Sequence, residues 1–306
     1  MNKVKGNEKI FVSIAAYLDL DVRNSILDGI KKAKYADRLV FGICWQYEEK
    51  ISVTAHYLDD LKGKCEIRIH KFNYTESQGP SWAKKRAAEM YTNEEFFLQT
   101  DAHVRFAQDW DSLLISELTE LKTKCRNPLI SFLPPTFTND VLEYTDQIDV
   151  INFPEILAVT PEHLFEYQEN NEKKTGFRNF PSPILEPGFI FGEGKWMRED
   201  FHHESIYYLG EEVYQSVKAY TEGYDFFLPK QIVSWRRSYY PSRIKHYTTH
   251  PTSDPKEKIK ESLICLQDLL QQKAIEISEN DQRSLEDYEA YAAVRFNLGK
   301  LNINAV

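Results

Sequence analysis

The fold is decided near the N-terminus, where the chain reads IFVSIAAY over residues 10–17 and LVFGICW over residues 39–45. Each run is short, apolar and rich in β-branched or aromatic residues, which is typical of a buried strand. Between them, apolar residues recur at helical spacing from Val22 to Ile30, so residues 22–34 are predicted to form an amphipathic helix. The order strand, helix, strand favours a right-handed βαβ unit in a parallel sheet.

The same alternation continues along the chain. Further strands are predicted over residues 66–72, 96–100, 129–133 and 187–192, and further helices over residues 81–91, 112–124, 211–223, 256–273 and 282–296. Residues 134–187 are rich in Pro, Asn and charge and have weak periodicity, so we expect an irregular insertion there. The expected fold class is α/β with a mainly parallel central sheet, in a domain over residues 1–252, with a helical extension over residues 253–306 that packs on it.

The overall charge excludes one class of partner. Asp and Glu number 47 against 38 Lys and Arg, a formal net charge of −9, so we expect no nucleic acid partner. An anionic ligand would need a local group of cations. The aromatic content is high, with 18 Tyr, 18 Phe and 5 Trp. Such rings either fill a core or line grooves that stack on sugars and bases.

The cysteines and the apolar runs indicate in which cellular compartment the protein is expected. Cys44, Cys65, Cys125 and Cys265 are scattered without a CxxC pair, which favours reduced thiols over a disulfide framework or a zinc site. Residues 1–9 are polar, and no apolar run approaches the roughly 18–20 residues of a membrane span. We therefore expect no membrane span and a cytoplasmic location.

The most informative segment follows the predicted strand over residues 96–100, which leads directly into Asp101, Ala102 and His103. Polar groups at the carboxyl end of such a strand lie where open α/β sheets bind ligands. Side chains at positions i and i+2 converge on one cation if the chain turns there, and an oxygen with an imidazole suits Mn²⁺ better than Ca²⁺. Taken alone, the pair favours a structural role, in which Asp101 caps a turn and His103 is packed or exposed; the neighbouring residues change this balance.

A second group of residues precedes this strand. The chain reads SQGPSWAKKR over residues 77–86, which places a glycine turn, a helix N-terminus and three cations near the same edge of the sheet. Backbone N–H groups at that terminus, together with Lys84 or Arg86, are suited to binding a diphosphate. The alternative is an amphipathic helix whose basic residues are solvated.

Together these motifs resemble a known family. They read Gly-Pro-x-x-Ala-(basic) from residue 79, Gln-x-Asp-x-His-x-x-Phe from residue 99 and Trp-Asp from residue 110, and are similar to the metal-dependent N-acetylglucosaminyltransferases that modify hydroxyproline on polypeptides. The resemblance extends over most of the chain. Further matching segments are IFVSIA from residue 10, GICWQ from residue 42, LGEE from residue 209, GYD from residue 223 and RSLEDYE from residue 283.

The resemblance implies a glycosyltransferase-A fold, a UDP-sugar donor, a divalent metal (Mn²⁺ or Mg²⁺) and retention of anomeric configuration. It implies that residues 1–252 are the catalytic domain, with residues 134–187 on its acceptor side. By position, Asp101 and His103 become metal ligands, and the cation would neutralise the departing diphosphate. The donor-side residues implied are Ser13, Ala15 and Tyr17 on the first strand, Gln78 and Gly79 in the turn, and Lys84, Arg86 and Asp101 beside the diphosphate.

The resemblance also implies an acceptor-side residue and a third metal ligand. Glu211 and Glu212 open a helix beside the acceptor, where one of them would accept a hydrogen bond from the acceptor hydroxyl or stabilise an oxocarbenium-like state. The helix dipole alone would also favour acidic residues there, and the sequence does not choose between the two. The family's third ligand is a histidine after this helix. Residues 233–237 contain none, so His246 and His250 are the nearest substitutes.

The leading hypothesis is therefore a metal-dependent, retaining glycosyltransferase that moves GlcNAc or a related sugar from UDP to a hydroxyl of a protein or a glycan. Arg236 or Arg237 would help to balance the diphosphate. The family usually has arginine where this chain has Lys84, which lacks a bidentate fork. This difference and the missing histidine motif keep open a catalytically weakened protein that binds nucleotide sugars or carbohydrate. A third hypothesis is a hydrolase that uses the same metal site and Glu212.

Overall fold

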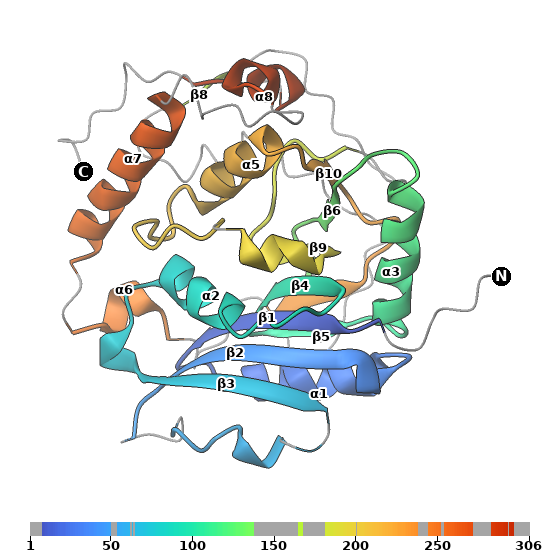
Figure 1. Ribbon diagram of the computed structural model, residues 1–306. Coiled ribbons are helices and arrows are strands. Elements are labelled where there is room, and N and C mark those ends of the chain that lie inside the picture. The colour runs from blue at the N-terminus through green and yellow to red at the C-terminus, as the bar shows by residue number, and fades with distance from the viewer. Residues whose placement is uncertain are drawn as a thin grey trace.

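A seven-stranded sheet forms the centre of the molecule, in the order β10-β6-β9-β4-β1-β2-β3 (Figure 1). Its strands are β1 (Ile10–Tyr17), β2 (Leu39–Tyr47), β3 (Glu66–Asn73), β4 (Phe96–Asp101), β6 (Pro128–Ser131), β9 (Phe189–Glu193) and β10 (Asp225–Phe227). Neighbouring strands are parallel except at β9, which is antiparallel to β4 and to β6. The predicted α/β fold with a mainly parallel sheet is confirmed.

This computed structural model describes most of the chain. The described residues are 8–49, 54–61, 63, 65–137, 165–167 (backbone only), 181–199, 201–237, 244–251, 254–271, 283–292 and 294–296. In this part of the chain no helix has both the length and the apolar character needed to cross a bilayer. All four cysteines are free thiols, as the scattered spacing predicts.

The predicted βαβ unit is present, with α1 (Val22–Lys32) connecting β1 to its parallel neighbour β2. Strands β1 and β4 are buried on both faces of the sheet. Phe11 and Phe97 belong to one apolar cluster, whereas Val12 and Leu98 belong to the other. Because successive side chains of a strand point to opposite faces, the continuous apolar runs of these strands fit a sheet that is covered on both sides.

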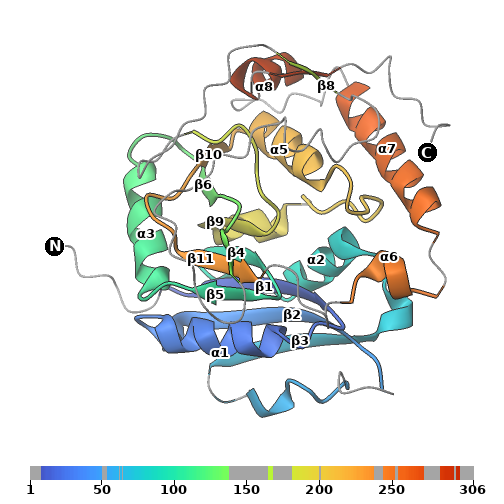
Figure 2. The same ribbon diagram turned by 180° about the vertical axis from the view of Figure 1, so that it is seen from behind.

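Helices cover both faces (Figures 1 and 2). One face packs against α1 and α3 (Trp110–Leu121), and the other against α2 (Pro80–Ala88) and α5 (Glu211–Thr221). Beyond α5 lie α7 (Pro255–Gln271) and α8 (Leu285–Ala292). Shorter helical segments are η1 (Ala36–Arg38), η2 (Asp59–Leu61), η3 (Tyr74–Glu76), η4 (Gly194–Arg198) and α6 (His246–Thr249).

The sequence does not predict two small sheets. One contains β5 (Val104–Phe106), β11 (Ser234–Arg237) and β7 (Thr136–Phe137), and the other pairs β8 (Phe165–Tyr167) with β12 (Val294–Phe296). These strands have two to four residues, too few to show a periodicity. The helix predicted over residues 282–296 is therefore too long, because α8 ends at Ala292 and β12 follows.

Helix α7 packs against α5, whereas the predicted division into a domain and an extension stays a prediction. Leu263, Leu266 and Leu270 of α7 are buried in the same apolar cluster as Val213 and Val217 of α5. Of the insertion, residues 138–164 and 168–180 lie outside the described residues, so its predicted irregular, acceptor-side character stays a prediction.

Candidate active site

The Asp-x-His motif lies where β4 ends and the chain turns into β5. Its backbone is held from two sides. Ser25 of α1 donates a hydrogen bond from Oγ to the carbonyl oxygen of Ala102 (2.8 Å), and the N–H of Asp101 donates to the carbonyl oxygen of Gly188 (3.3 Å). Both Asp101 and His103 are thus fixed at the carboxyl edge of the sheet, where ligands of open α/β sheets bind.

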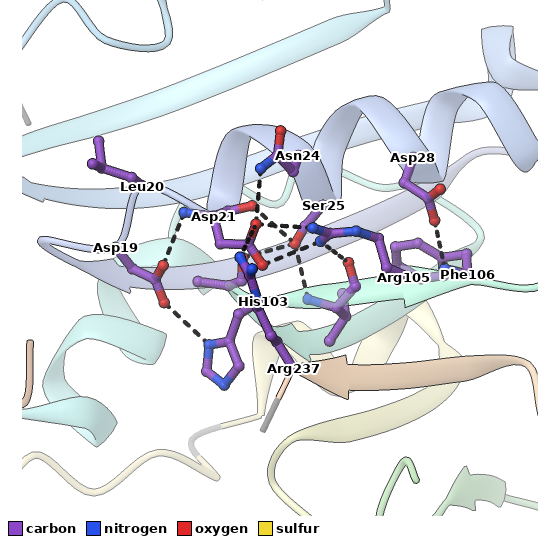
Figure 3. Close-up of polar contacts among 12 residues, drawn as sticks. Asp19, Leu20, Asp21, Asn24, Ser25, Asp28, His103, Arg105, Phe106 and Arg237 are labelled. Carbon is purple, nitrogen blue, oxygen red and sulfur yellow. Dashed lines mark hydrogen bonds and ion pairs between the residues drawn. The ribbon is translucent and has the colours of Figure 1, made fainter. Parts of the chain in front are cut away.

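His103 is buried, and its ring is oriented by Asp19 in the loop between β1 and α1 (Figure 3). Nδ1 of His103 lies 3.1 Å from Oδ2 of Asp19, whose Oδ1 accepts a hydrogen bond from the N–H of Asp21 (3.0 Å). Asp21 is paired with Arg105 (2.9 Å) and Arg237 (3.5 Å), and the N–H of Arg237 donates to the carbonyl oxygen of His103 (2.7 Å). One polar network therefore joins the β1–α1 loop, the Asp-x-His turn and β11.

The donor chemistry at this edge fits a divalent cation with two protein ligands. Asp101 offers a carboxylate and His103 an imidazole, a set that suits Mn²⁺. A Cβ at Gly188 would lie 3.0 Å from Oδ2 of Asp101, so the glycine keeps space open beside this carboxylate. Among the described residues, no three His, Cys, Asp or Glu side chains are arranged to hold a metal. The other ligands would be phosphate oxygens of a substrate and water.

The structure does not bring His246 or His250 to this pair, and so gives no support to their predicted role as third ligand. Helix α6 places both rings beside another loop. His246 contacts Oη of Tyr207 through Nδ1 (2.8 Å) and the carbonyl oxygen of Ser77 through Nε2 (3.4 Å), and His250 contacts the carbonyl oxygen of Thr75 (3.2 Å). Burial, helped by the neighbouring His250 ring, lowers the pKa of His246 to about 4.

Two residues of β1 that were predicted to lie on the donor side are close to Asp101. Ala15 pairs with Asp101 across the β1–β4 ladder, and Ser13 pairs with Gln99 two residues earlier. Ser13, Ala15 and Asp101 therefore project from the same face of the sheet. The hydroxyl of Ser13 is buried with no hydrogen-bond partner, which leaves it able to bind a ligand or water.

The other donor-side residues lie farther along the edge. Tyr17 ends β1 beneath α6, with its ring centroid 4.9 Å from that of His246. Gly79 has a φ of +121°, and a Cβ there would lie 2.5 Å from the ring of Tyr207, so both the turn and its packing require glycine. Gln78 beside it is exposed.

The predicted phosphate-binding cations have other partners. Nζ of Lys84 lies 2.8 Å from Oε1 of Glu211, and both side chains are nearly buried. Burial would lower the pKa of Lys84, but the carboxylates of Glu211 and Asp101 outweigh it and raise this pKa. Arg86 lies two residues further along α2, on a different face of the helix from Lys84, and pairs with Glu204. Lys84 is therefore the cation that α2 supplies near Asp101, and Glu211 neutralises much of its charge.

Glu212 and Glu186 complete a group of acidic side chains around Asp101. Burial and the neighbouring Glu211 raise the pKa of Glu212 to about 7. Burial, Glu212 and Asp101 raise the pKa of Glu186 to about 8, against the lowering effect of Arg236. Glu186 was not predicted from the sequence, because an acidic residue in the loop before β9 gives no signal that it approaches Asp101 and Glu212.

Comparisons with known proteins identify the family and the fold. The family model described as Glycosyltransferase (GlcNAc) matches residues 53–303. Among solved structures, GalNAc-T7 with UDP, GalNAc and Mn²⁺ superposes with a TM-score of 0.56 at 12% identity, over 93% of this chain and 55% of that one. This chain therefore spans about half the length of GalNAc-T7. No curated protein matches.

A second similar structure is TarS of S. aureus, residues 1–349. It superposes with a TM-score of 0.54 and 9% identity in complex with UDP, and with 0.52 and 11% in complex with UDP-GlcNAc. In both cases the match covers 93% of this chain and 70% of that one. At such identities the likeness shows the fold, which is the predicted glycosyltransferase-A fold. Since the family model covers most of the sequence, the chain belongs to the GlcNAc glycosyltransferase family.

Proposed function

We propose that the protein is a metal-dependent, retaining glycosyltransferase that moves GlcNAc or a related sugar from a UDP-sugar to a hydroxyl acceptor. The observation that carries this proposal is the site around Asp101. There the end of β4 meets a buried Lys84–Glu211 pair and the carboxyl group of Glu212, in a chain of glycosyltransferase family and fold.

On the donor side, Asp101 and His103 would hold the divalent cation. When bound, Mn²⁺ or Mg²⁺ supplies positive charge that stabilises the UDP diphosphate as it leaves. Gly188 keeps the space beside Asp101 open, and Lys84 adds a cation within electrostatic range of that carboxylate. Ser13 and Ala15 on β1 border the same site, as expected for residues that contact the nucleotide.

On the acceptor side, the two adjacent glutamates have different roles. Glu211 is occupied by Lys84, which fixes its orientation and holds α5 against α2. Glu212 is the group that accepts the hydrogen bond from the acceptor hydroxyl. A carboxyl group with a pKa of about 7 is a better proton acceptor than an ordinary glutamate and is still ionised in good part at neutral pH.

The acceptor is proposed to be a hydroxyl of a protein or a glycan. The resemblance to hydroxyproline-modifying enzymes supports a protein acceptor, and the glycosyltransferase fold supports either class. GalNAc-T7 and TarS, which share the fold, were solved with UDP or UDP-GlcNAc, which supports a UDP-sugar donor.

The test is to incubate the protein with a panel of nucleotide sugars, Mn²⁺ and native extracts. UDP release and a mass increase of one sugar on an acceptor are the expected products, and NMR of the first-formed glycoside should show the anomeric configuration of the donor. Transfer from a purine nucleotide sugar alone, or an inverted product, would contradict the proposal.

One observation favours a second candidate, a nucleotide-sugar-binding protein with weakened catalysis. Lys84 is tied to Glu211, and no third protein ligand accompanies Asp101 and His103 among the described residues. In this case UDP-GlcNAc binds without release of UDP in the presence of any acceptor pool.

A further inference from the structure

The orientation of His103 depends on a residue that the motif does not include. His103 is 6% exposed, and its Nδ1 lies 3.1 Å from Oδ2 of Asp19. The other ring nitrogen, Nε2, points away from Asp19 (Figure 3). Because a carboxylate accepts hydrogen bonds and cannot donate them when ionised, Asp19 selects the form of His103 that carries a proton on Nδ1.

Asp19 is itself held in place. It is 8% exposed, and its Oδ1 accepts a hydrogen bond from the N–H of Asp21 (3.0 Å). The preceding residue, Leu18, is buried with a φ of +49°, a left-handed conformation that a leucine rarely adopts. The N–H of Leu18 donates to the carbonyl oxygen of Gln46 on β2 (2.9 Å), so the strained residue is anchored to the sheet. Strain of this kind persists where the surrounding structure imposes it, often at functional sites.

The remainder of the loop is fixed from the opposite side. Asp21 is 3% exposed and receives hydrogen bonds from Arg105, from Arg237 and from the side chain of Asn24 (2.8 Å) (Figure 3). Arg105 follows His103 in β5, and the backbone of Arg237 bonds to the carbonyl oxygen of His103. Asp19 therefore contacts the ring of His103, while Asp21 binds the side chains of Arg105 and Arg237 on the strands β5 and β11 beside it.

We propose that Asp19 is a positioning residue for the metal site: by accepting a hydrogen bond from Nδ1–H of His103, it leaves Nε2 of His103 as the nitrogen that binds the cation. Carboxylate partners of this kind fix the tautomer of a ligating histidine and make it more basic, and their loss typically costs 10–100-fold in metal affinity. The inference rests on the proposed function, because it concerns the cation of the same site.

The first measurement determines the tautomer of His103 in the absence of metal. In the full chain labelled with ¹⁵N-histidine, long-range ¹H–¹⁵N spectra at pH 8 should show His103 protonated on Nδ1 and not on Nε2. The signal is assigned by its disappearance in His103→Gln. In Asp19→Ala the preference should be lost. A wild-type ring protonated on Nε2, or a tautomer that Asp19→Ala leaves unchanged, would overturn the inference without touching the proposed function.

The second measurement is Mn²⁺ affinity in the presence of UDP, followed by electron paramagnetic resonance. Asp19→Asn keeps the shape and an oxygen for the N–H of Asp21 but removes the charge, and should weaken Mn²⁺ binding by about 10–100-fold. The matched control is Asp28→Asn. Asp28 ties α1 to β5 by accepting from the N–H of Phe106 (2.7 Å), and does not contact His103, so affinity should change by less than about twofold.

The outcomes separate the two claims. If Asp19→Asn, with an unchanged melting temperature, binds Mn²⁺ as tightly as the wild type, the positioning role is wrong and the metal-dependent function stands. If the wild-type chain with UDP binds no Mn²⁺ at all, the metal dependence of the proposed function fails, and the inference fails with it.

Discussion

At the scale of single residues, neighbours in the sequence have different surroundings in the structure. Glu211 and Glu212 begin α5 side by side, and the sequence treats them alike. The structure pairs Glu211 with Lys84 from another helix and leaves Glu212 with a pKa of about 7. The difference arises from a partner 127 positions away, which no local pattern reveals.

Glu212 should therefore govern the pH dependence of transfer. Its carboxyl group must be ionised to accept the acceptor proton, so kcat/KM should rise from pH 5 to pH 8 with a midpoint near 7. Glu212→Gln should lower kcat about 10²–10⁴-fold and abolish this rise. Glu222→Gln, at the other end of α5, is the control and should keep both the rate and the profile. An unchanged profile in Glu212→Gln would refute the assignment.

At the scale of elements, periodic segments are predictable and short ones are not. The longer helices and six strands of the central sheet follow from runs of five or more residues in which burial dictates the apolar positions. The seventh strand, β10, has only three residues and was not predicted. Strands β5 and β11 have three and four residues, and their pairing brings Val104 opposite Arg236, far along the chain. Such contacts depend on the finished sheet, so they carry no sequence signal.

The Lys84–Glu211 pair joins α2 to α5, and removal of one partner should be costly. Lys84→Met or Glu211→Gln alone leaves a buried charge unpaired and should destabilise the protein by about 3–5 kcal/mol in urea unfolding. The double variant should be less destabilised than the sum of the two single changes. The exposed Lys124–Glu120 pair, treated in the same way, is the control and should show little coupling. Additive effects at Lys84 and Glu211 would show that the pair does not hold the helices together.

A buried acid on α3 should make stability depend on pH. Burial raises the pKa of Glu117 to about 7, although its Oε1 accepts a hydrogen bond from the N–H of Lys230 (2.9 Å). In the unfolded chain this group loses its proton near its ordinary value of 4.5, whereas the folded chain retains it until about pH 7. The group's contribution to stability is therefore complete below 4.5 and is lost as the pH rises through 7.

Glu117→Gln keeps an oxygen that accepts the hydrogen bond from the N–H of Lys230, and it removes the titratable carboxyl group. Relative to the wild type, the variant should gain up to about 3 kcal/mol between pH 4.5 and pH 8, measured by urea unfolding across this range. A stability difference that stays constant with pH would mean that Glu117 is not held neutral in the folded protein.

At the scale of the whole molecule, the C-terminal extension is part of the core. Leu266 of α7 is fully buried, and a Cβ at Gly210, the residue before Glu211, would lie 2.2 Å from its Cδ1. Helix α7 therefore packs directly against the start of α5, where Glu211 and Glu212 lie.

Leu266→Ala should thus destabilise the chain by about 2–5 kcal/mol through the cavity that it leaves. Ile264 lies two positions earlier on the same helix but is 43% exposed, so Ile264→Ala should cost less than about 0.5 kcal/mol. Equal effects of the two substitutions in urea unfolding would show that α7 does not pack as described.

The candidate site was predictable where one segment carries its chemistry and not where it is assembled from several. Asp101 and His103 share one turn after one strand, and this spacing together with the glycine turn and cations of residues 77–86 suggests them. Asp19 and Glu186 reach the site from loops 82 and 85 positions away from Asp101, and His246 stays outside it because α6 packs beside Tyr17. Distant loops are brought together only by the order of the strands in the sheet.

We propose that Asp101 binds a cation that holds the donor diphosphate. The most direct test is calorimetric titration of wild-type protein and Asp101→Asn with UDP-GlcNAc, each with and without Mn²⁺. Mn²⁺ should tighten binding to the wild type by about tenfold or more and should give no such gain in Asp101→Asn. Equal affinity with and without Mn²⁺ in the wild type, or a full gain in the variant, would contradict it.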